Sequence, residues 1–284
     1  MPDSTRHDGG SRLEEEQTSI SGHPFDVDTA VVADGPDRFT ATVTDRWHAL
    51  GGGPNGGYLA ALCVQALAQI IDFPDPLVMS TSFLRRARVG AAELHTQLLR
   101  SGRRIATGAV SLSQDGDIAV HTVASFTDFT TASGRTALFN EPPDLPPPEQ
   151  CEDLVGGADL PGVSILDQFE YRVPELPGWR RGEPSGTASA ELWLRFRDGR
   201  DADLAALPLL VDATAPAVLD LGAPGSSTIQ LTTHIRARPA PGWLAVRIMT
   251  RYVIGGFHEE DVELWDDDGR LVAQGRQLAL LAHG

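Results

Sequence analysis

The stretch that decides the fold covers residues 227–281. It begins with Ser227-Thr228-Ile229-Gln230, and its last strand contains Gly269-Arg270-Leu271-Val272-Ala273-Gln274-Gly275-Arg276-Gln277. Apolar and polar residues alternate along it, which is typical of a meander of antiparallel strands. Because side chains alternate with a period of two along a strand, Gln277 falls on a face of small and apolar residues. A buried amide without hydrogen-bond partners costs about 1–3 kcal/mol, so we expect Gln277 to have partners elsewhere in the chain.

The elements predicted upstream of this stretch repeat the same plan. In the first copy we predict strands within 25–46, a buried helix over 58–71, and strands over 77–88, 92–101, 105–114 and 118–129. In the second copy we predict strands over 169–173 and 188–196, a helix over 203–221, and strands over 227–238, 243–253, 258–266 and 270–281. Asp115-Gly116 and Asp268-Gly269 are hairpin signals at the same place in both copies. Two tandem copies of a long helix on an antiparallel sheet predict an α+β layer fold.

Composition sets the boundaries between these units. Residues 1–24 are polar and lack periodicity, so they are expected to form a disordered tail. Residues 131–161 contain a proline-rich run, which is typical of an extended linker. The sequence therefore predicts a first unit over 25–130 and a second over 162–284.

Charge and length narrow the class of protein. The 284 residues are 41% hydrophobic and carry a net charge of −16. This acidic balance argues against a nucleic-acid partner, because neutralising phosphates requires basic residues. No apolar run reaches the roughly 18–20 residues that a membrane span needs, and the acidic N-terminus is unlike a signal peptide. Cys63 and Cys151 lack metal-ligand spacing. We expect a cytoplasmic protein without a metal or cofactor.

A glycine-rich segment precedes the first predicted helix. It reads Gly51-Gly52-Gly53-Pro54-Asn55-Gly56-Gly57. Asn55 is a suitable N-cap, and the glycines would let a substrate approach the free N–H groups at Gly56 and Gly57. No Gly-Lys-Ser/Thr follows, so the segment is not a Walker loop. The functional interpretation is a site for a substrate carbonyl or oxyanion, and the alternative is a loop that only needs positive φ.

Arginines gather near the turns of the first copy, against the acidic balance of the whole chain. They are Arg85, Arg86, Arg88, Arg100, Arg103 and Arg104. As a group they are a candidate phosphate contact, with Arg85, Arg86 and Arg103 as the proposed core. Solvated strand ends are the alternative interpretation for each of them.

The second predicted helix carries one carboxylate, Asp212, among apolar neighbours. A carboxylate on an apolar face must be paired, hydrogen-bonded or shifted in pKa. Pro216 has no N–H for the carbonyl of Asp212, so we expect a kink that leaves that oxygen free. The alternative is an aspartate that faces solvent.

Taken in order, these motifs resemble those of the type II acyl-CoA thioesterases (TesB-like), which are double hotdog proteins. The resemblance covers almost everything from Phe25 onward. Its first-half motifs are the glycine-rich helix start, Ser80-Thr81-Ser82-Phe83-Leu84-Arg85-Arg86, Leu99-Arg100-Ser101-Gly102-Arg103 and Ala124-Ser125-Phe126. The chain departs from the family at Arg86, where a proline is usual, and at Arg236-Ala237-Arg238-Pro239, which is one residue longer.

The resemblance implies a double hotdog fold and hydrolysis of an acyl-CoA to a free fatty acid and CoA. It assigns a water-activating set to Asp212, Thr228 and Gln277, with Ser227 as the alternative to Thr228. Asp212 would act as the base, and the other two would hold the water. Asn55, Gly56, Gly57, Arg85, Arg86 and Arg103 would bind the substrate. The sequence contains no Gly-x-Ser-x-Gly nucleophile elbow.

Two other functions stay open at this stage. A hotdog hydratase or dehydratase would need a histidine near the helix start, where His48 is the candidate. A non-catalytic acyl-CoA-binding hotdog protein would keep the fold without the chemistry. A monomer and a homo-oligomer of double hotdogs both satisfy the pattern.

Overall fold

The computed structural model describes residues 22–157 and 162–282, so the tail predicted at 1–24 lies almost wholly outside the described residues. The first half of the chain contains β5–β8 and the elements before them. Its elements are α1 (Pro24–Asp28), β1 (Val32–Ala33), β2 (Arg38–Val43), η1 (Asp45–Trp47), β3 (His48–Ala49), β4 (Gly53–Pro54), α2 (Gly56–Ala68), β5 (Asp75–Phe83), β6 (Gly90–Ser101), β7 (Ala106–Gln114) and β8 (Asp117–Thr127).

The second half contains the elements from η2 onward. They are η2 (Pro148–Gln150), β9 (Glu152–Asp153), η3 (Ser164–Gln168), β10 (Phe169–Val173), α3 (Gly178–Arg181), β11 (Ser189–Phe196), α4 (Leu207–Leu210), η4 (Ala217–Leu221), β12 (Ser226–Ile235), β13 (Leu244–Met249), β14 (Val253–Ile254), β15 (Phe257–Trp265) and β16 (Leu271–Leu281). The four long strands predicted at the end of each copy are present, within a few residues of the expected bounds.

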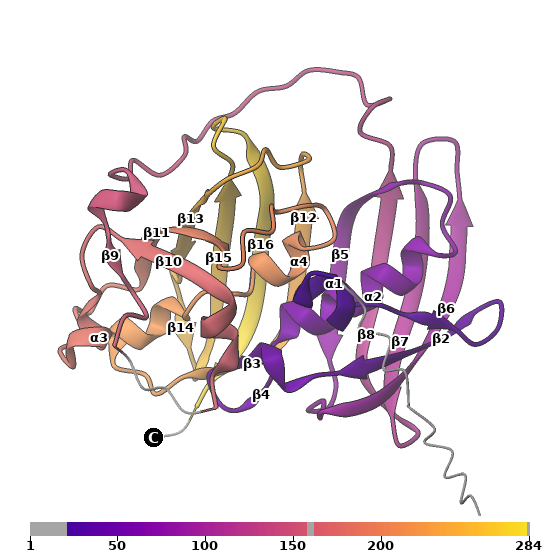
Figure 1. Ribbon diagram of the computed structural model, residues 1–284, viewed down its shortest axis with the longest axis horizontal. Coiled ribbons are helices and arrows are strands. Elements are labelled where there is room, and N and C mark those ends of the chain that lie inside the picture. Colours follow the sequence, from indigo (N-terminus) through magenta and orange to yellow (C-terminus); the bar gives the residue numbers. More distant parts are fainter. Residues whose placement is uncertain (1–21, 158–161, 283–284) are drawn as a thin grey trace, which may run out of the picture.

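One antiparallel sheet runs through both halves. Within the described residues its strand order is β1-β2-β6-β7-β8-β5-β12-β16-β15-β13-β11-β10-β9, with β14 paired to β15. The halves join where β5 pairs with β12, from Gln230 opposite Ser82 to His234 opposite Val78. Figure 1 shows the helices α1, α2 and α4 gathered in front of this junction, with the linker crossing above the second half. The sheet therefore brings the start of α2 next to the second half.

Helix α2 is buried because it is apolar nearly all round its surface. Its Asn55 cap accepts a 2.9 Å hydrogen bond from the Tyr58 N–H, as predicted. The Tyr58 ring is fully buried and stacks on Trp47, with ring centroids 5.9 Å apart. Both ends of the first turn are thus held by groups from outside the helix.

The continuous helix predicted over 203–221 is wrong. The chain there forms a four-residue helix, α4, then turns, and then a 3-10 helix, η4. Pro208 can start a helix because its missing N–H needs no partner in the first turn, whereas Pro216 cannot continue one. Asp212 consequently lies in the irregular segment after α4, where its side chain is not confined to a helix face. The strand predicted at Phe25 is also wrong, because Pro24–Asp28 is helical.

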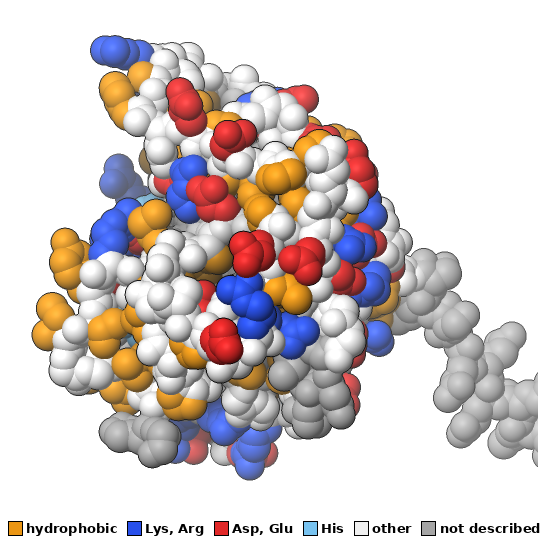
Figure 2. Space-filling model, turned by 90° about the vertical axis from the view of Figure 1, so that its left-hand side faces the viewer, with side chains coloured by type: hydrophobic (Ala, Val, Ile, Leu, Met, Phe, Trp, Pro, Cys, Tyr) orange, Lys and Arg blue, Asp and Glu red, His pale blue; other side chains and the backbone are white. Residues whose placement is uncertain are grey.

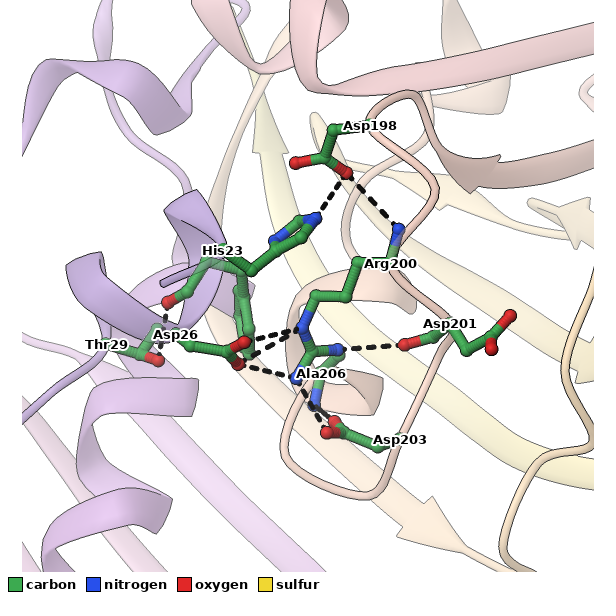
Figure 3. Close-up of polar contacts among 9 residues, drawn as sticks. His23, Asp26, Thr29, Asp198, Arg200, Asp201, Asp203 and Ala206 are labelled. Carbon is green, nitrogen blue, oxygen red and sulfur yellow. Dashed lines mark hydrogen bonds and ion pairs between the residues drawn. The ribbon is translucent and has the colours of Figure 1, made fainter. Parts of the chain in front are cut away.

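A largely buried arginine, Arg200, joins the first helix to the second half by ion pairs. The Arg200 guanidinium, 10% exposed, lies 2.7 Å from Asp26 of α1 and 2.6 Å from Asp203. It also lies over the ring of Phe25, 4.7 Å from the centroid. Figure 3 shows Asp26 and Asp203 beside Arg200, together with the contact between His23 and Asp198.

The surface beside β9, β10 and α3 carries charges of both signs. Figure 2 shows arginines and acidic side chains interspersed on this face. Ion pairs join Arg181 to Glu175 at 2.7 Å and Arg172 to Asp153 at 3.8 Å. Across the described ranges, no helix is both long and apolar enough to cross a membrane.

Candidate active site

A cavity of about 460 Å³ opens at the junction of the two halves. Its polar lining includes Asn55 and Gly56 at the start of α2, and Asp212, Thr228 and Gln277 of the second half. Its apolar lining includes Leu59, Phe83, Leu84, Leu154, Val155, Val163, Ile165, Leu166, Trp179 and Leu219. A polar floor beside an apolar wall suits a ligand that has a reactive polar group and a hydrocarbon chain.

The start of α2 holds the carboxylate of Asp212. Its Oδ2 accepts hydrogen bonds from the Gly57 N–H at 2.8 Å and from Asn55 Nδ2 at 2.9 Å. Asn55 Nδ2 also donates to the backbone carbonyl of Asp212 at 2.8 Å. The cap residue of α2 therefore fixes both the side chain and the backbone at this position.

Burial raises the pKa of Asp212 to about 6, while hydrogen bonds from Gly57, Asn55 and Gly56 oppose the shift. Removal from water penalises the charged form, and N–H donors favour it. A carboxylate with this pKa is ionised at neutral pH and still basic enough to take a proton from an attacking water.

Thr228 and Gln277 form a hydrogen-bonded pair on adjacent strands. Thr228 Oγ1 donates to Gln277 Oε1 at 2.6 Å. The pairing of β12 with β16 shifts register between Thr228 and Gln230, so a bulge brings the Thr228 side chain to the amide. Ser227 also lines the cavity, but the bond to Gln277 is made by Thr228.

Glu260 is the second partner of Gln277, and we did not predict it. Gln277 Nε2 donates to Glu260 Oε1 at 2.6 Å, and Glu260 Oε2 accepts from the Ala217 N–H at 2.8 Å. Glu260 lies on the same face of β15 as the buried residues His258, Val262 and Leu264. A carboxylate on the buried face of a predicted strand is a sequence signal that could have identified it.

The structure brings most of the predicted site residues together. Asn55, Gly56, Asp212, Thr228, Gln277, Arg85 and Arg86 line one cavity. Arg103 lies apart from them. It is in the turn between β6 and β7, next to the Thr127 end of β8, whereas Arg85 and Arg86 follow the Phe83 end of β5, which pairs with Val120. The predicted cluster of Arg85, Arg86 and Arg103 is therefore wrong, because β8 separates its members along its length.

The prediction of a free N–H at Gly57 is also wrong, because this group already donates to Asp212. The close approach of α2 to the segment around Asp212 explains why residue 57 is a glycine. A Cβ at Gly57 would lie 2.8 Å from the Cβ of Asp212 and would collide with the Pro208 carbonyl. The glycines at this helix start let α2 reach Asp212.

His48 does not share this site. It lies in β3, and the residues that line the cavity among those described include its neighbour Ala49 but not His48. Leu62 and Met79 are packed in the core and are not among the described residues that line the cavity.

Known proteins resemble this chain over most of its length. Residues 43–127 match the acyl-CoA thioesterase N-terminal domain, and residues 148–281 match the acyl-CoA thioesterase C-terminal domain. The uncharacterised protein Rv0499 of Mycobacterium tuberculosis is 30% identical over 265 residues, which cover 86% of this chain and 90% of that protein.

Solved structures agree with the fold. A protein from Thermobifida fusca, described as a candidate thioesterase II, superposes with a TM-score of 0.82 at 31% identity, covering 93% of this chain and 99% of that one. A protein of unknown function with a hot dog fold from Alicyclobacillus acidocaldarius has a TM-score of 0.80 at 24% identity, with coverage of 93% and 99%.

The fold and the two family matches together define a double hotdog hydrolase that acts on thioesters. The chain belongs to the acyl-CoA thioesterase family. The expected fold class and enzyme class are thus confirmed.

Proposed function

We propose that this protein hydrolyses an acyl-CoA thioester to a free fatty acid and CoA, with Asp212 as the general base. The observation that carries the proposal is the junction of the halves, where an ionisable carboxylate and a hydroxyl–amide pair line one partly apolar cavity. General acid–base chemistry needs such a group within reach of a positioned water.

In the proposed reaction, Thr228 and Gln277 hold a water molecule beside Asp212. Asp212 takes one proton as the water oxygen bonds to the thioester carbonyl carbon. The tetrahedral intermediate then collapses, the carbon–sulfur bond breaks, and the proton on Asp212 passes to the leaving thiolate. No covalent intermediate with the protein is formed.

The apolar wall would hold the acyl chain, with Leu59 and Leu219 near the carboxylate. Arg85 is the better candidate for a CoA phosphate, since its side chain is 63% exposed and its contact with Asp117, at 3.3 Å, lies at the surface. Arg86 instead donates to the carbonyls of Gly51 and Gly52, so it braces the loop before α2.

The test is the release of free thiol from a panel of short- to long-chain acyl-CoAs, comparing wild type with Asp212→Ala. Turnover that collapses in the variant supports the proposal, and the panel gives the chain length. Near wild-type turnover in Asp212→Ala contradicts the assigned base. Acyl-CoA binding without turnover in either protein would indicate the non-catalytic alternative.

A further inference from the structure

Glu260 is a buried carboxylate whose role the proposed reaction leaves unassigned. Its side chain is 2% exposed, and both of its oxygens are engaged. Oε1 accepts from Gln277 of β16, and Oε2 accepts from the backbone of Ala217, the first residue of η4. Burying a carboxylate is costly, so such a group needs compensation from well-placed donors.

The bond to Glu260 determines which way the Gln277 amide points. With Nε2 directed at the carboxylate, Oε1 faces Thr228 and accepts its hydroxyl proton. The reversed amide would set Oε1 against the carboxylate of Glu260, an acceptor facing an acceptor. The Thr228 oxygen keeps its lone pairs, and Gln277 Nε2 keeps one hydrogen for a water in the cavity.

The second oxygen of Glu260, Oε2, fixes the backbone next to residues that line the cavity. Ala217 directly follows Pro216, which lines the cavity with Ala215 and Leu219. One carboxylate thus ties the hydroxyl–amide pair to the segment that leads away from Asp212.

We propose that ionised Glu260 is a positioning residue, which orients the Gln277 amide and the backbone at Ala217 for hydrolysis. This inference rests on the proposed function. Glu260 acts through Gln277, and it does not line the cavity among the described residues.

Protonation of Glu260 would undo this arrangement. Burial raises the pKa of Glu260 to about 7, opposed by the bonds from Ala217 and Gln277 and reinforced by the charge of Asp212. A protonated carboxyl can donate a hydrogen bond to the amide oxygen of Gln277, which favours the reversed orientation of that amide.

Other titratable groups near Glu260 do not replace it. His258 shares its strand face, and burial lowers the pKa of this histidine below its usual value. Asp220 of η4 is directed at the N–H groups of Trp179 and Ser185. Glu259 and Asp261 point to the opposite strand face.

The experiment compares Glu260→Gln with Glu259→Gln in steady-state thiol-release assays from pH 5 to 9. Glutamine at 260 has the same shape, but its amide cannot accept from both Gln277 and Ala217. Glu259 is the matched control, because its carboxylate also accepts two hydrogen bonds, in its case from the backbone N–H groups of Arg251 and Tyr252.

For Glu260→Gln we expect kcat to fall at least about tenfold with KM little changed, since misplacing one group in a preorganised site costs rate more than binding. We expect two ionisations, of Asp212 and Glu260, on the acid limb of the wild-type pH profile. The Glu260→Gln profile should show one of them, and the Glu259→Gln profile should show both. An unchanged kcat in a folded Glu260→Gln overturns the inference.

The wild-type profile tests the same idea without any variant. Two ionisations on its acid limb, from Asp212 and Glu260, support the inference, and a single one overturns it even if Glu260→Gln fails to fold. Absence of wild-type turnover would contradict the proposed function itself, and the inference would fall with it.

Discussion

The Gly57 N–H of α2 donates a 2.8 Å hydrogen bond to the carboxylate of Asp212, 155 residues further along the chain. This bond joins the two halves at the point where the proposed chemistry occurs. An N–H group at a helix start favours a negative charge, so α2 stabilises the ionised form that a base requires. Neither half contains the site alone.

Gly57→Ala should therefore damage both stability and activity. The new Cβ would meet the Pro208 carbonyl and would lie 2.8 Å from the Cβ of Asp212, so α2 must move away. We expect a loss of about 1–3 kcal/mol in unfolding free energy by urea titration, with a large fall in kcat. Gly156→Ala is the control, because its Cβ would meet only Asp153, at 3.3 Å. Equal effects of the two changes would contradict the close-approach argument.

Asp212→Asn should stabilise the protein more at high pH than at low pH. The folded pKa of Asp212 is raised from 3.8 to about 6, so the folded state binds the proton more tightly than the unfolded state. Wild type consequently loses stability as pH rises through this window, by up to about 3 kcal/mol, and the variant lacks this loss. Unfolding curves from pH 4 to 8 measure the difference in unfolding free energy between Asp212→Asn and wild type. Asp34→Asn, at an exposed position, is the control. A free-energy difference for Asp212→Asn that does not change with pH would contradict burial of the charge.

The hydroxyl of Thr228 should matter more for activity than the shape of the side chain. Thr228→Val removes the donor to Gln277 and leaves the amide oxygen unpaired, whereas Thr228→Ser keeps the hydroxyl. We expect kcat to fall about tenfold or more in the valine variant, and to stay within about threefold of wild type in the serine variant. Thiol release at saturating substrate measures both. Similar losses in both variants would indicate a packing role instead.

Arg200→Ala should destabilise the junction at α1. Its guanidinium is 10% exposed and is paired with Asp26 and Asp203 over an aromatic ring, so its removal leaves two carboxylates without their partner. We expect a loss of about 1–2 kcal/mol, because Asp26 and Asp203 are about half exposed and water can solvate them. For Arg181→Ala, whose pair with Glu175 is exposed, we expect about 0–1 kcal/mol. Thermal unfolding distinguishes them. A loss below 1 kcal/mol at Arg200 would mean that α1 is held by apolar packing alone.

The local sequence pattern was sufficient to predict a helix, strand or turn wherever the residues of that element determine its structure. The alternation of 227–281, the apolar helix after Asn55 and the Asp-Gly turns predicted the strands, α2 and the hairpins, since period and turn chemistry are properties of adjacent residues. The prediction of one helix over 203–221 was wrong because it gave more weight to the apolar spacing than to Pro208 and Pro216. Pro216 was expected to kink the helix, but α4 already ends at Leu210, and Pro216 is the N-cap of the 3-10 helix η4 that follows.

By itself, the sequence determined the repeated α+β plan and the residues that resemble a thioesterase set, because periodicity and motif order are written along the chain. Only the tertiary structure decided which groups meet. The pairing of β5 with β12 brings Gly57 to Asp212, β15 places Glu260 behind Gln277, and the length of β8 keeps Arg103 away from Arg85. Such contacts join residues far apart in the chain, and their partners depend on strand order and register, which no local pattern encodes.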